Sequence, residues 1–279
     1  MKKISRRSFL AAAGLSVAAL ALTACGGSSA STASSVASSA ASSEAASTSA
    51  AAGELTTVEA GKLTMATNAT FPPYEMTTDA GEFEGIDIEA AQAIADKLGL
   101  ELQIDNMDFD AALLSVQQGK ADITMAGITV TDERKAVMAF SDSYATGIQS
   151  IIVPEGSDIA SPDDLADKKI GTQRGTTGYI YCTDDFGEDA VVAYDSGLTA
   201  VQALNNGQVD AVVIDNAPAK EFVAANPGLV ILDTSYAEED YAIGMAKGSS
   251  LEDAVNATLE ELKADGTLQA IVDKYITAE

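Results

Sequence analysis

The sequence predicts an α/β protein of two lobes, each with a mostly parallel sheet flanked by helices. Short apolar runs typical of strands alternate with amphipathic helical segments from about residue 62 onward. The order β-α-β-α-β occurs twice, and this order predicts a parallel sheet with helices on both faces. A stretch of the first half also resembles a stretch of the second at a constant offset of 88 residues.

In the first half, residues 63–67 are predicted to form a strand, and the helix after them ends at Gly99. Asp87 is the candidate N-cap of that helix, because Asp is favoured where a side chain accepts the first free N–H groups. A strand over 100–104, a helix over 110–118 and a strand over 122–126 complete the first unit.

The second half repeats this order. Ser161-Pro162-Asp163-Asp164 predicts a helix start, with a Ser cap, Pro in the first turn and an acid three residues after the cap. Strands are predicted over 169–172, 191–194 and 210–214, with a helix over 198–205, and two more helices near 251–264 and 267–276.

The internal similarity aligns residues 113–127 with residues 201–215, and both stretches show a helix, a Gly, an Asp and an apolar strand. The alignment predicts that Gly127 and Asp215 lie at the carboxyl ends of equivalent strands, one in each lobe. Open α/β sheets bind ligands at that edge, so two facing lobes would form a cleft there.

The first 54 residues are predicted to lie outside the fold. Four basic residues within the first seven precede an apolar stretch, 9–24, which has the layout of an export signal, and 5–10 also fit its twin-arginine variant. Leu22-Thr23-Ala24-Cys25 resembles a bacterial lipobox, which implies a lipid on Cys25; the alternative is a plain secretory signal. We therefore expect a signal over 1–25 and a disordered Ser/Ala-rich tether over 26–61.

The composition argues against several classes of function. Twelve of the 16 Lys and Arg residues and all 42 Asp and Glu residues follow Cys25, so the processed chain would have a formal charge of −30. Such acidity argues against nucleic acid as a partner. The absence of histidine removes the commonest general base and most zinc sites, so we expect neither a metal nor a cofactor.

Aromatic side chains follow the first two predicted strands. Asn68 and Phe71 belong to a loop that Pro72-Pro73 makes rigid, and Phe109 follows the second strand. Because parallel strands end at the same edge of a sheet, these loops are expected to meet there. Phe71 could line a cleft at this edge, or it could fill the core beneath the loop.

Polar groups follow the third strand. Gly127 exposes backbone, Thr129 offers a hydroxyl, and Arg134 offers a planar guanidinium suited to a carboxylate, unless it pairs with a neighbouring acid. In the second half, the turn over 175–178 opens a helix whose free N–H groups favour an anion. The expected cleft thus offers a cation and an amide-rich helix start at one end.

Asp215 follows an apolar strand. Burial of an unpaired carboxylate there would destabilise the fold by roughly several kcal/mol, because the charge loses its hydration. Asp215 also suits the N-cap of a helix over 217–225, a role that is compatible with binding a ligand. A free α-amino acid supplies both the carboxylate that a cation needs and the ammonium that this anion needs.

Segments 67–74, 85–88, 107–109, 126–134 and 175–177, with Asp215, resemble the polar amino acid-binding proteins of bacterial ABC importers, the family 3 extracellular solute-binding proteins. Segment 126–134 is the most specific. The resemblance implies a type II periplasmic-binding fold of two lobes, 62–148 plus 240–279 and 149–239. Two hinge strands would join the lobes near 147–151 and 239–243.

The resemblance also implies roles for the site residues. Arg134 would hold the α-carboxylate with Thr129 and Thr177, while Asp215 would hold the α-ammonium near the Gly127 carbonyl. Phe71 and Phe109 would enclose the side chain of the ligand, and Asn68 and Gln173 would bind its polar end. The complete set expected to bind ligand is Asn68, Phe71, Phe109, Ala126, Gly127, Thr129, Arg134, Gln173, Thr177 and Asp215.

Asn68 departs from many family members that prefer basic or glutamine ligands, which often have an acid there. A neutral amide removes the partner of a cationic side chain, so a polar uncharged amino acid such as glutamine is expected, with cystine as the alternative. The fold also resembles the periplasmic cyclohexadienyl dehydratases, but such an enzyme needs an acid over the substrate, and no glutamate has an evident place in the cleft.

The resemblance implies a receptor rather than an enzyme. Such a receptor would close on its amino acid by a hinge motion and deliver it to an ABC permease in the membrane. Cys25 would anchor the protein, expected to be a monomer, to the cell membrane on the extracellular or periplasmic side.

Overall fold

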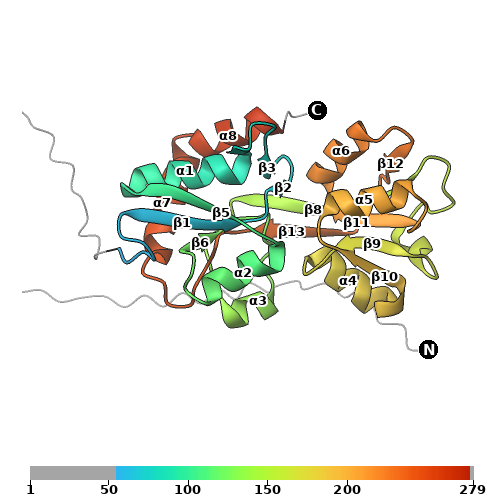
Figure 1. Ribbon diagram of the computed structural model, residues 1–279, viewed down its shortest axis with the longest axis horizontal. Coiled ribbons are helices and arrows are strands. Elements are labelled where there is room, and N and C mark those ends of the chain that lie inside the picture. Colours follow the sequence, from blue (N-terminus) through green and yellow to red (C-terminus); the bar gives the residue numbers. More distant parts are fainter. Residues whose placement is uncertain (1–54, 277–279) are drawn as a thin grey trace, which may run out of the picture. The chain divides into compact units, whose positions relative to one another are not determined.

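The computed structural model describes residues 55–276, in which two α/β lobes lie side by side (Figure 1). The predicted signal over 1–25, with Cys25, and the tether up to residue 54 lie outside the described residues. Residues 56 and 58, at the end of the predicted tether, bond to the first lobe: Thr56 N donates to Ser250 Oγ and Val58 N to Asp122 Oδ1.

The first lobe contains a mixed five-stranded sheet. β1 lies between β5 and β6 and runs parallel to both, whereas β14 and β7 continue the sheet in antiparallel pairs beyond β6. Helices α1, α7 and α8 cover one face, and α2 and α3 lie on the other (Figure 1). The bounds are β1 Lys62–Thr67, α1 Ile86–Leu98, β5 Glu101–Asn106, α2 Phe109–Gln117, β6 Ile123–Thr124, α3 Asp132–Val137, β7 Ala139–Phe140, β14 Gly244–Met245, α7 Glu252–Ala264 and α8 Thr267–Tyr275.

The second lobe repeats the parallel trio in a six-stranded sheet. β9 lies between β10 and β11 and is parallel to both, and β8 pairs antiparallel with β11, β12 and β13. Helices α5 and α6 lie over one face, and α4 lies over the other (Figure 1). The bounds are β8 Ala145–Pro154, η1 Pro162–Leu165, β9 Ile170–Gln173, α4 Thr177–Phe186, η2 Glu188–Ala190, β10 Val191–Tyr194, α5 Gly197–Asn205, β11 Ala211–Asp215, α6 Asn216–Ala225, β12 Leu229–Ile231 and β13 Ala237–Tyr241.

Two antiparallel strands, β8 and β13, run between the lobes (Figure 1). Their register pairs Glu239 with Gly147 and Tyr241 with Ala145. Of these four residues, Ala145 lies two residues before the segments that were expected to form the hinge. This is the two-lobed arrangement with a two-strand hinge that the sequence predicted. Parallel pairing is limited to three strands in each sheet, because β14 in the first sheet and β8 in the second run antiparallel to their neighbours.

The two stretches that align in sequence, 113–127 and 201–215, occupy equivalent positions in the two lobes. β6 lies beside β1 in the first sheet, and β11 lies beside β9 in the second, so the aligned strands occupy matching positions. Gly127 follows β6 and Asp215 ends β11, which places both at the carboxyl edge of their parallel trio. The prediction made from the 88-residue offset is confirmed.

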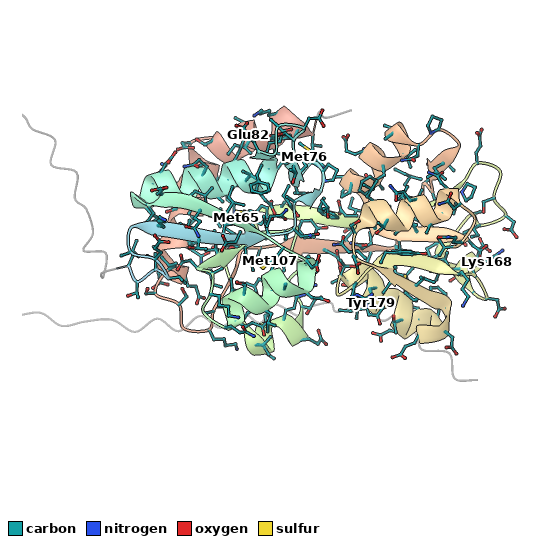
Figure 2. All side chains as sticks on the ribbon, in the orientation of Figure 1. Met65, Met76, Glu82, Met107, Lys168 and Tyr179 are labelled. Atoms are coloured by element: carbon teal, nitrogen blue, oxygen red, sulfur yellow. The ribbon has the colours of Figure 1, made fainter. Side chains whose placement is uncertain are left out.

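Each lobe has its own apolar core. Met65, which lies inside the first lobe (Figure 2), is fully buried with Leu63, Ile94 and Ile123. In the second lobe the apolar faces of β11 and α5 bury Val212 and Val201, and the free Cys182 is buried on the opposite side of the sheet. Two cores joined by two strands leave the facing edges of the lobes free to form a pocket.

The small sheet after β1 corrects one prediction. It consists of β2 (Thr70–Phe71), β3 (Glu75–Thr77) and β4 (Phe83–Glu84), and it leads into α1 through Gly85, which is the N-cap of that helix. Asp87 was expected to cap α1, but it lies inside the first turn with a fully buried side chain. Its carboxylate bonds elsewhere, to the backbone of the loop after β6.

Candidate functional site

The candidate site is a pocket with about 460 Å³ of empty volume between the facing edges of the two lobes. Loops after β1, β6 and β9 reach it, together with the middle of β8 and the ends of β11 and β13. All ten residues predicted to bind ligand line it: Asn68, Phe71, Phe109, Ala126, Gly127, Thr129, Arg134, Gln173, Thr177 and Asp215. The structure therefore brings the predicted constellation together in one place.

Arg134 provides the cation of the pocket. Thr131 caps the short helix α3 by accepting the Arg134 backbone N–H, which turns the guanidinium toward the second lobe. There Nη1 donates to Thr129 O at 2.8 Å and Nη2 to Gly175 O at 3.1 Å, while the guanidinium carbon lies 5.5 Å from the centre of the Phe109 ring. Both partners are carbonyls, so the charge of Arg134 is not neutralised by direct contact.

Burial lowers the pKa of Arg134, and the negative charge of Glu239 opposes that shift. The side chain is only 8% exposed, yet an arginine remains protonated at any physiological pH. Arg134 is also the one Lys or Arg among the described residues that line the pocket. Lys168, by contrast, lies at the end of the second lobe away from the first (Figure 2), where it pairs with Asp158.

The start of α4 faces Arg134. Gly175 has a φ of 74°, a conformation that glycine adopts freely, and this turn lets Thr176 cap the helix by accepting the Tyr179 N–H. Thr177, the first residue of α4, lies with its Oγ1 3.3 Å from Thr129 Oγ1. Two hydroxyls, free helix N–H groups and a guanidinium therefore meet at one end of the pocket, an arrangement suited to a carboxylate.

Asp215 provides the opposite charge. Its Oδ1 accepts the Ala217 N–H at 3.0 Å, which confirms the predicted cap of α6, and its Oδ2 accepts the Ile148 N–H from hinge strand β8 at 2.8 Å. Burial raises the pKa of Asp215 to about 6, although these N–H donors and the Tyr241 hydroxyl oppose the shift. At neutral pH the group is mostly ionised, and no cation of the described residues forms an ion pair with it in the structure.

Two amides bridge the lobes. Gln173 Nε2, at the end of β9, donates to Asn68 Oδ1 at 2.9 Å, and Asn68 Nδ2 donates to Met107 O at 2.8 Å. Phe71 stacks against Tyr74 with ring centres 5.7 Å apart, and it packs so close to Gly127 that a Cβ there would lie 2.8 Å from Phe71 Cε1. Phe71 therefore lines the pocket and also packs on the first core, so both of its expected roles apply.

The expectation that no glutamate lies in the cleft is wrong. Glu75, on β3, is fully buried and lines the pocket. Its two carboxylate oxygens have no hydrogen-bond partner within the described residues, and neither has Asp87 Oδ1. Glu75 directly follows the recognised segment 67–74, so its neighbourhood was visible in the sequence although its burial was not.

Glu75 and Asp87 form a buried carboxyl pair. Burial, followed by the charge of Asp87, raises the pKa of Glu75 well above its ordinary value, and burial raises the pKa of Asp87 to about 6. Two ionised carboxylates only accept, so one shared proton is needed to join them and relieve their repulsion. Asp87 Oδ2 accepts the Gly127 N–H at 3.0 Å, which fixes the pocket loop after β6.

The hinge strands contribute further lining residues that were not predicted. Gln149 on β8 and Tyr241 on β13 line the pocket, as do Val213 and Ile214 of β11 and Thr176. A Cβ at Gly147 would collide with the ring of Tyr241, so this glycine allows the ring to lie across β8. Gln149 and Tyr241 both lie within the predicted hinge segments. Whether their side chains face the pocket depends on the register of β8 and β13.

The sequence profile of the bacterial extracellular solute-binding proteins, family 3, matches residues 63–278. The chain belongs to this family. The profile thus spans both lobes and the hinge, including every residue that lines the pocket.

Proteins similar to this chain include binding proteins for several amino acids. The L-cystine-binding protein TcyJ of Escherichia coli is 31% identical over 79% of this chain and 85% of its own length. The structure of ArtJ from Geobacillus stearothermophilus, an arginine-, lysine-, histidine-binding protein, has a TM-score of 0.75 at 33% identity over 78% of this chain and 96% of its own. The structure of an ancestral arginine-binding protein bound to glutamine has a TM-score of 0.75 at 40% identity, and the match covers 78% of this chain and 99% of the other.

These neighbours confirm the type II periplasmic-binding fold. Within 55–276 no helix is long and apolar enough to cross a membrane. Among the same residues no group of three or more acidic or cysteine side chains is placed to hold a metal ion.

Proposed function

We propose that this protein is the substrate-binding component of an ABC importer, which captures a polar, uncharged, glutamine-like L-amino acid and delivers it to a membrane permease. The observation that carries the proposal is the pair Arg134 and Asp215, two buried and oppositely charged groups on one pocket. Within residues 55–276 both are held by backbone groups, and neither has a direct ionic partner. The α-carboxylate and α-ammonium of an amino acid supply both partners.

The carboxylate would bind at Arg134, with Thr129 and Thr177 as further donors. The ammonium would bind at Asp215, near the carbonyl of Gly127, whose loop Asp87 holds in place. Each ligand charge then meets a group that is already buried, so little further desolvation of the protein is needed when the ligand enters.

The side chain would lie between Phe71 and Phe109 and end at Asn68 and Gln173. Amides both donate and accept, which matches the side-chain amide of glutamine. Glu75 adds a buried carboxyl group whose pKa is raised by burial, which favours its neutral form and a neutral polar group beside it. The glutamine bound in a related ancestral protein supports this choice.

Cystine is the alternative ligand, supported by the similarity to the cystine-binding protein of Escherichia coli. Its two polar ends would need both amides and a longer pocket. A dehydratase-like enzyme is the second candidate function, because a protonated Glu75 in the pocket is the kind of acid that such chemistry needs. We favour a receptor, since the family is one of solute-binding proteins.

Capture would occur by closure of the two lobes, with the proposed bounds 62–148 plus 240–279 and 149–239, about strands β8 and β13. The protein would act as a monomer, anchored by a lipid on Cys25 to the outer face of the cell membrane, with residues 26 to about 54 as a tether. Radiolabelled palmitate incorporated by the wild type and lost in Cys25→Ser would support the anchor, whereas equal labelling would refute it.

Isothermal titration against the twenty common amino acids and cystine tests the proposed function. We expect binding of glutamine or cystine with micromolar affinity or better, and much weaker binding of acidic and basic amino acids. Silence across the panel would refute the receptor proposal. Conversion of prephenate or arogenate by the same preparation would instead establish the dehydratase-like activity.

A further inference from the structure

Glu239 is a buried acidic residue that does not line the pocket. It lies in hinge strand β13 and is 5% exposed, whereas Glu238 and Asp240 on either side are exposed. Its Oε2 accepts Gln149 Nε2 at 2.9 Å, while Oε1 is buried without a partner among the described residues. One bond to a neutral amide, with the Tyr181 hydroxyl nearby, does not compensate the burial of a carboxylate, so a positive charge close to it would stabilise it.

Arg134 supplies that charge. Among the groups whose charge favours its cationic form, Glu239 contributes most. The two are not in direct contact, because the guanidinium donates to the Thr129 and Gly175 carbonyls. Glu239 therefore acts on Arg134 through the low-dielectric interior, where charges interact more strongly than in water.

Gln149 links Glu239 to the pocket. Its Nε2 is bound to Glu239, and it lines the pocket itself. A Cβ at Gly178, in the first turn of α4, would lie 2.9 Å from Gln149 Oε1, so the amide packs against the helix start that faces Arg134. The position of Glu239 thus influences both the charge and the shape of this end of the pocket.

On the basis of the proposed function, we propose that Glu239 is an internal counter-charge that weakens binding of the ligand α-carboxylate. Glu239 is a positioning residue: it acts through Arg134 and Gln149 and does not line the pocket. The negative charge of Glu239 stabilises the Arg134 guanidinium while the pocket is empty. When a ligand binds, the same charge repels the ligand carboxylate at Arg134. The bound amino acid is then released more easily than a lone buried arginine would allow.

The test compares Glu239→Gln with Glu238→Gln, the exposed neighbour on the same strand, by calorimetric titration. The probes are L-glutamine, L-cystine and L-arginine, each as the free acid and as its α-amide, in which the carboxylate is replaced by a neutral group. We expect Glu239→Gln to bind the free acids about tenfold more tightly. The α-amides should bind the wild type and both variants alike, and Glu238→Gln should match the wild type.

A gain shared by the α-amides, or a loss of affinity for both forms, would show a structural role and overturn the proposal. If Glu239→Gln does not fold, Glu239→Met removes the charge with an apolar side chain of similar length and should show the same gain for free acids only. A wild type that binds no probe overturns the proposed function and this inference with it. Binding that Glu239→Gln leaves unchanged overturns the inference alone.

Discussion

At the scale of single residues, Arg134 and Asp215 show how a pocket can be charged before its ligand arrives. Backbone groups, rather than opposite charges, hold both side chains: two carbonyls bind Arg134 and two N–H groups bind Asp215. Such bonds fix the geometry of each ion but leave much of its desolvation uncompensated. A zwitterionic ligand would compensate both at once, whereas a singly charged solute would leave one of the two ions without a partner.

Replacement of Arg134 by Ala is expected to weaken amino acid binding by about 100-fold or more, because a ligand carboxylate would lose the one cation that the described residues bring to the pocket. Arg174 provides the matched control, since it is exposed and lies 3.8 Å from Asp195. Titration of both variants should show loss in Arg134→Ala and near wild-type affinity in Arg174→Ala. Equal affinity of the two variants would contradict the assigned role of Arg134.

Asp215 predicts a pH dependence of binding. Because its pKa is raised to about 6, the carboxylate is lost as the pH falls through this value, and with it the partner of the ammonium. The association constant should therefore drop about tenfold from pH 7 to pH 5. Asp87 titrates in the same range, so Asp87→Asn should keep this profile; a flat profile, or one that Asp87→Asn abolishes, would contradict the role of Asp215.

Sequence reasoning succeeds for residues whose chemistry is unusual where they stand. Arg134 and Asp215 are charged groups next to apolar strands, which indicates a functional edge. Glu75 and Asp87 were missed for the opposite reason: an acid in a loop is expected to face water, and an Asp at a helix start is expected to cap it. Only tertiary packing reveals that both are fully buried, and that the charge of Asp87 acts on Glu75 to raise its pKa.

At the scale of elements, the carboxyl pair between β3 and α1 should affect stability. Glu75 is protonated in the folded protein at pH values where the unfolded chain has lost that proton, so stability falls as the pH rises from the ordinary glutamate pKa toward the raised one. The slope is about 1.4 kcal/mol per pH unit while one proton is held.

Glu75→Gln should remove that loss, because an amide does not titrate and can still bond to Asp87. Urea unfolding at pH 5 and pH 8 should show a smaller decrease for Glu75→Gln than for the wild type. Glu82→Gln, on the exposed turn of the same small sheet (Figure 2), should behave as the wild type does. A wild-type decrease that Glu75→Gln leaves intact would rule out the shared proton.

The hinge pair β8–β13 contributes to the site through close packing. The ring of Tyr241 lies against Gly147, and its hydroxyl faces Asp215. Gly147→Ala is expected to displace that ring, destabilise the protein by about 1–3 kcal/mol and weaken ligand binding. Thr146 lies on the same strand with its side chain exposed, so Thr146→Ala is the control. Calorimetric titration and thermal melting measure the binding and the stability of the two variants. Unchanged binding in Gly147→Ala would contradict the role of Tyr241.

Strand register explains why the hinge residues escaped prediction. The crossings were placed within a few residues of β8 and β13, but alternate residues of a strand face opposite sides. A shift of one residue would exchange Gln149 for the exposed Ile148 at the pocket. The pairing of Glu239 with Gly147 sets this register, and it is a tertiary feature.

At the scale of the whole molecule, a few polar contacts among residues 55–276 join the lobes across the pocket, and Phe71 of the first lobe also packs against the core of the second. Gln173 bonds to Asn68, Arg134 bonds to Gly175, and Thr129 meets Thr177. Separate cores and few cross-lobe bonds favour hinge motion about β8 and β13. The two-lobed plan was predictable because the β-α-β pattern repeats, whereas the contacts that close the pocket depend on the side chains of both lobes together.

Small-angle X-ray scattering should therefore show a smaller radius of gyration when a binding amino acid is added. Gln173→Ala, which removes one cross-lobe bond, should shift the ligand-free protein further toward the open form and weaken binding modestly. Gln208→Ala, at an exposed site of the second lobe, is the control. Scattering that does not change with ligand would contradict closure.

The central claim is that the pocket recognises the two α-groups of an amino acid with Arg134 and Asp215. Calorimetric titration with L-glutamine, with its α-amide and with the analogue in which hydrogen replaces the α-amino group tests it most directly. We predict binding of L-glutamine and a loss of about 100-fold or more for each analogue, because each leaves one buried charge unpaired. Analogues that bind as tightly as the parent amino acid would contradict the account.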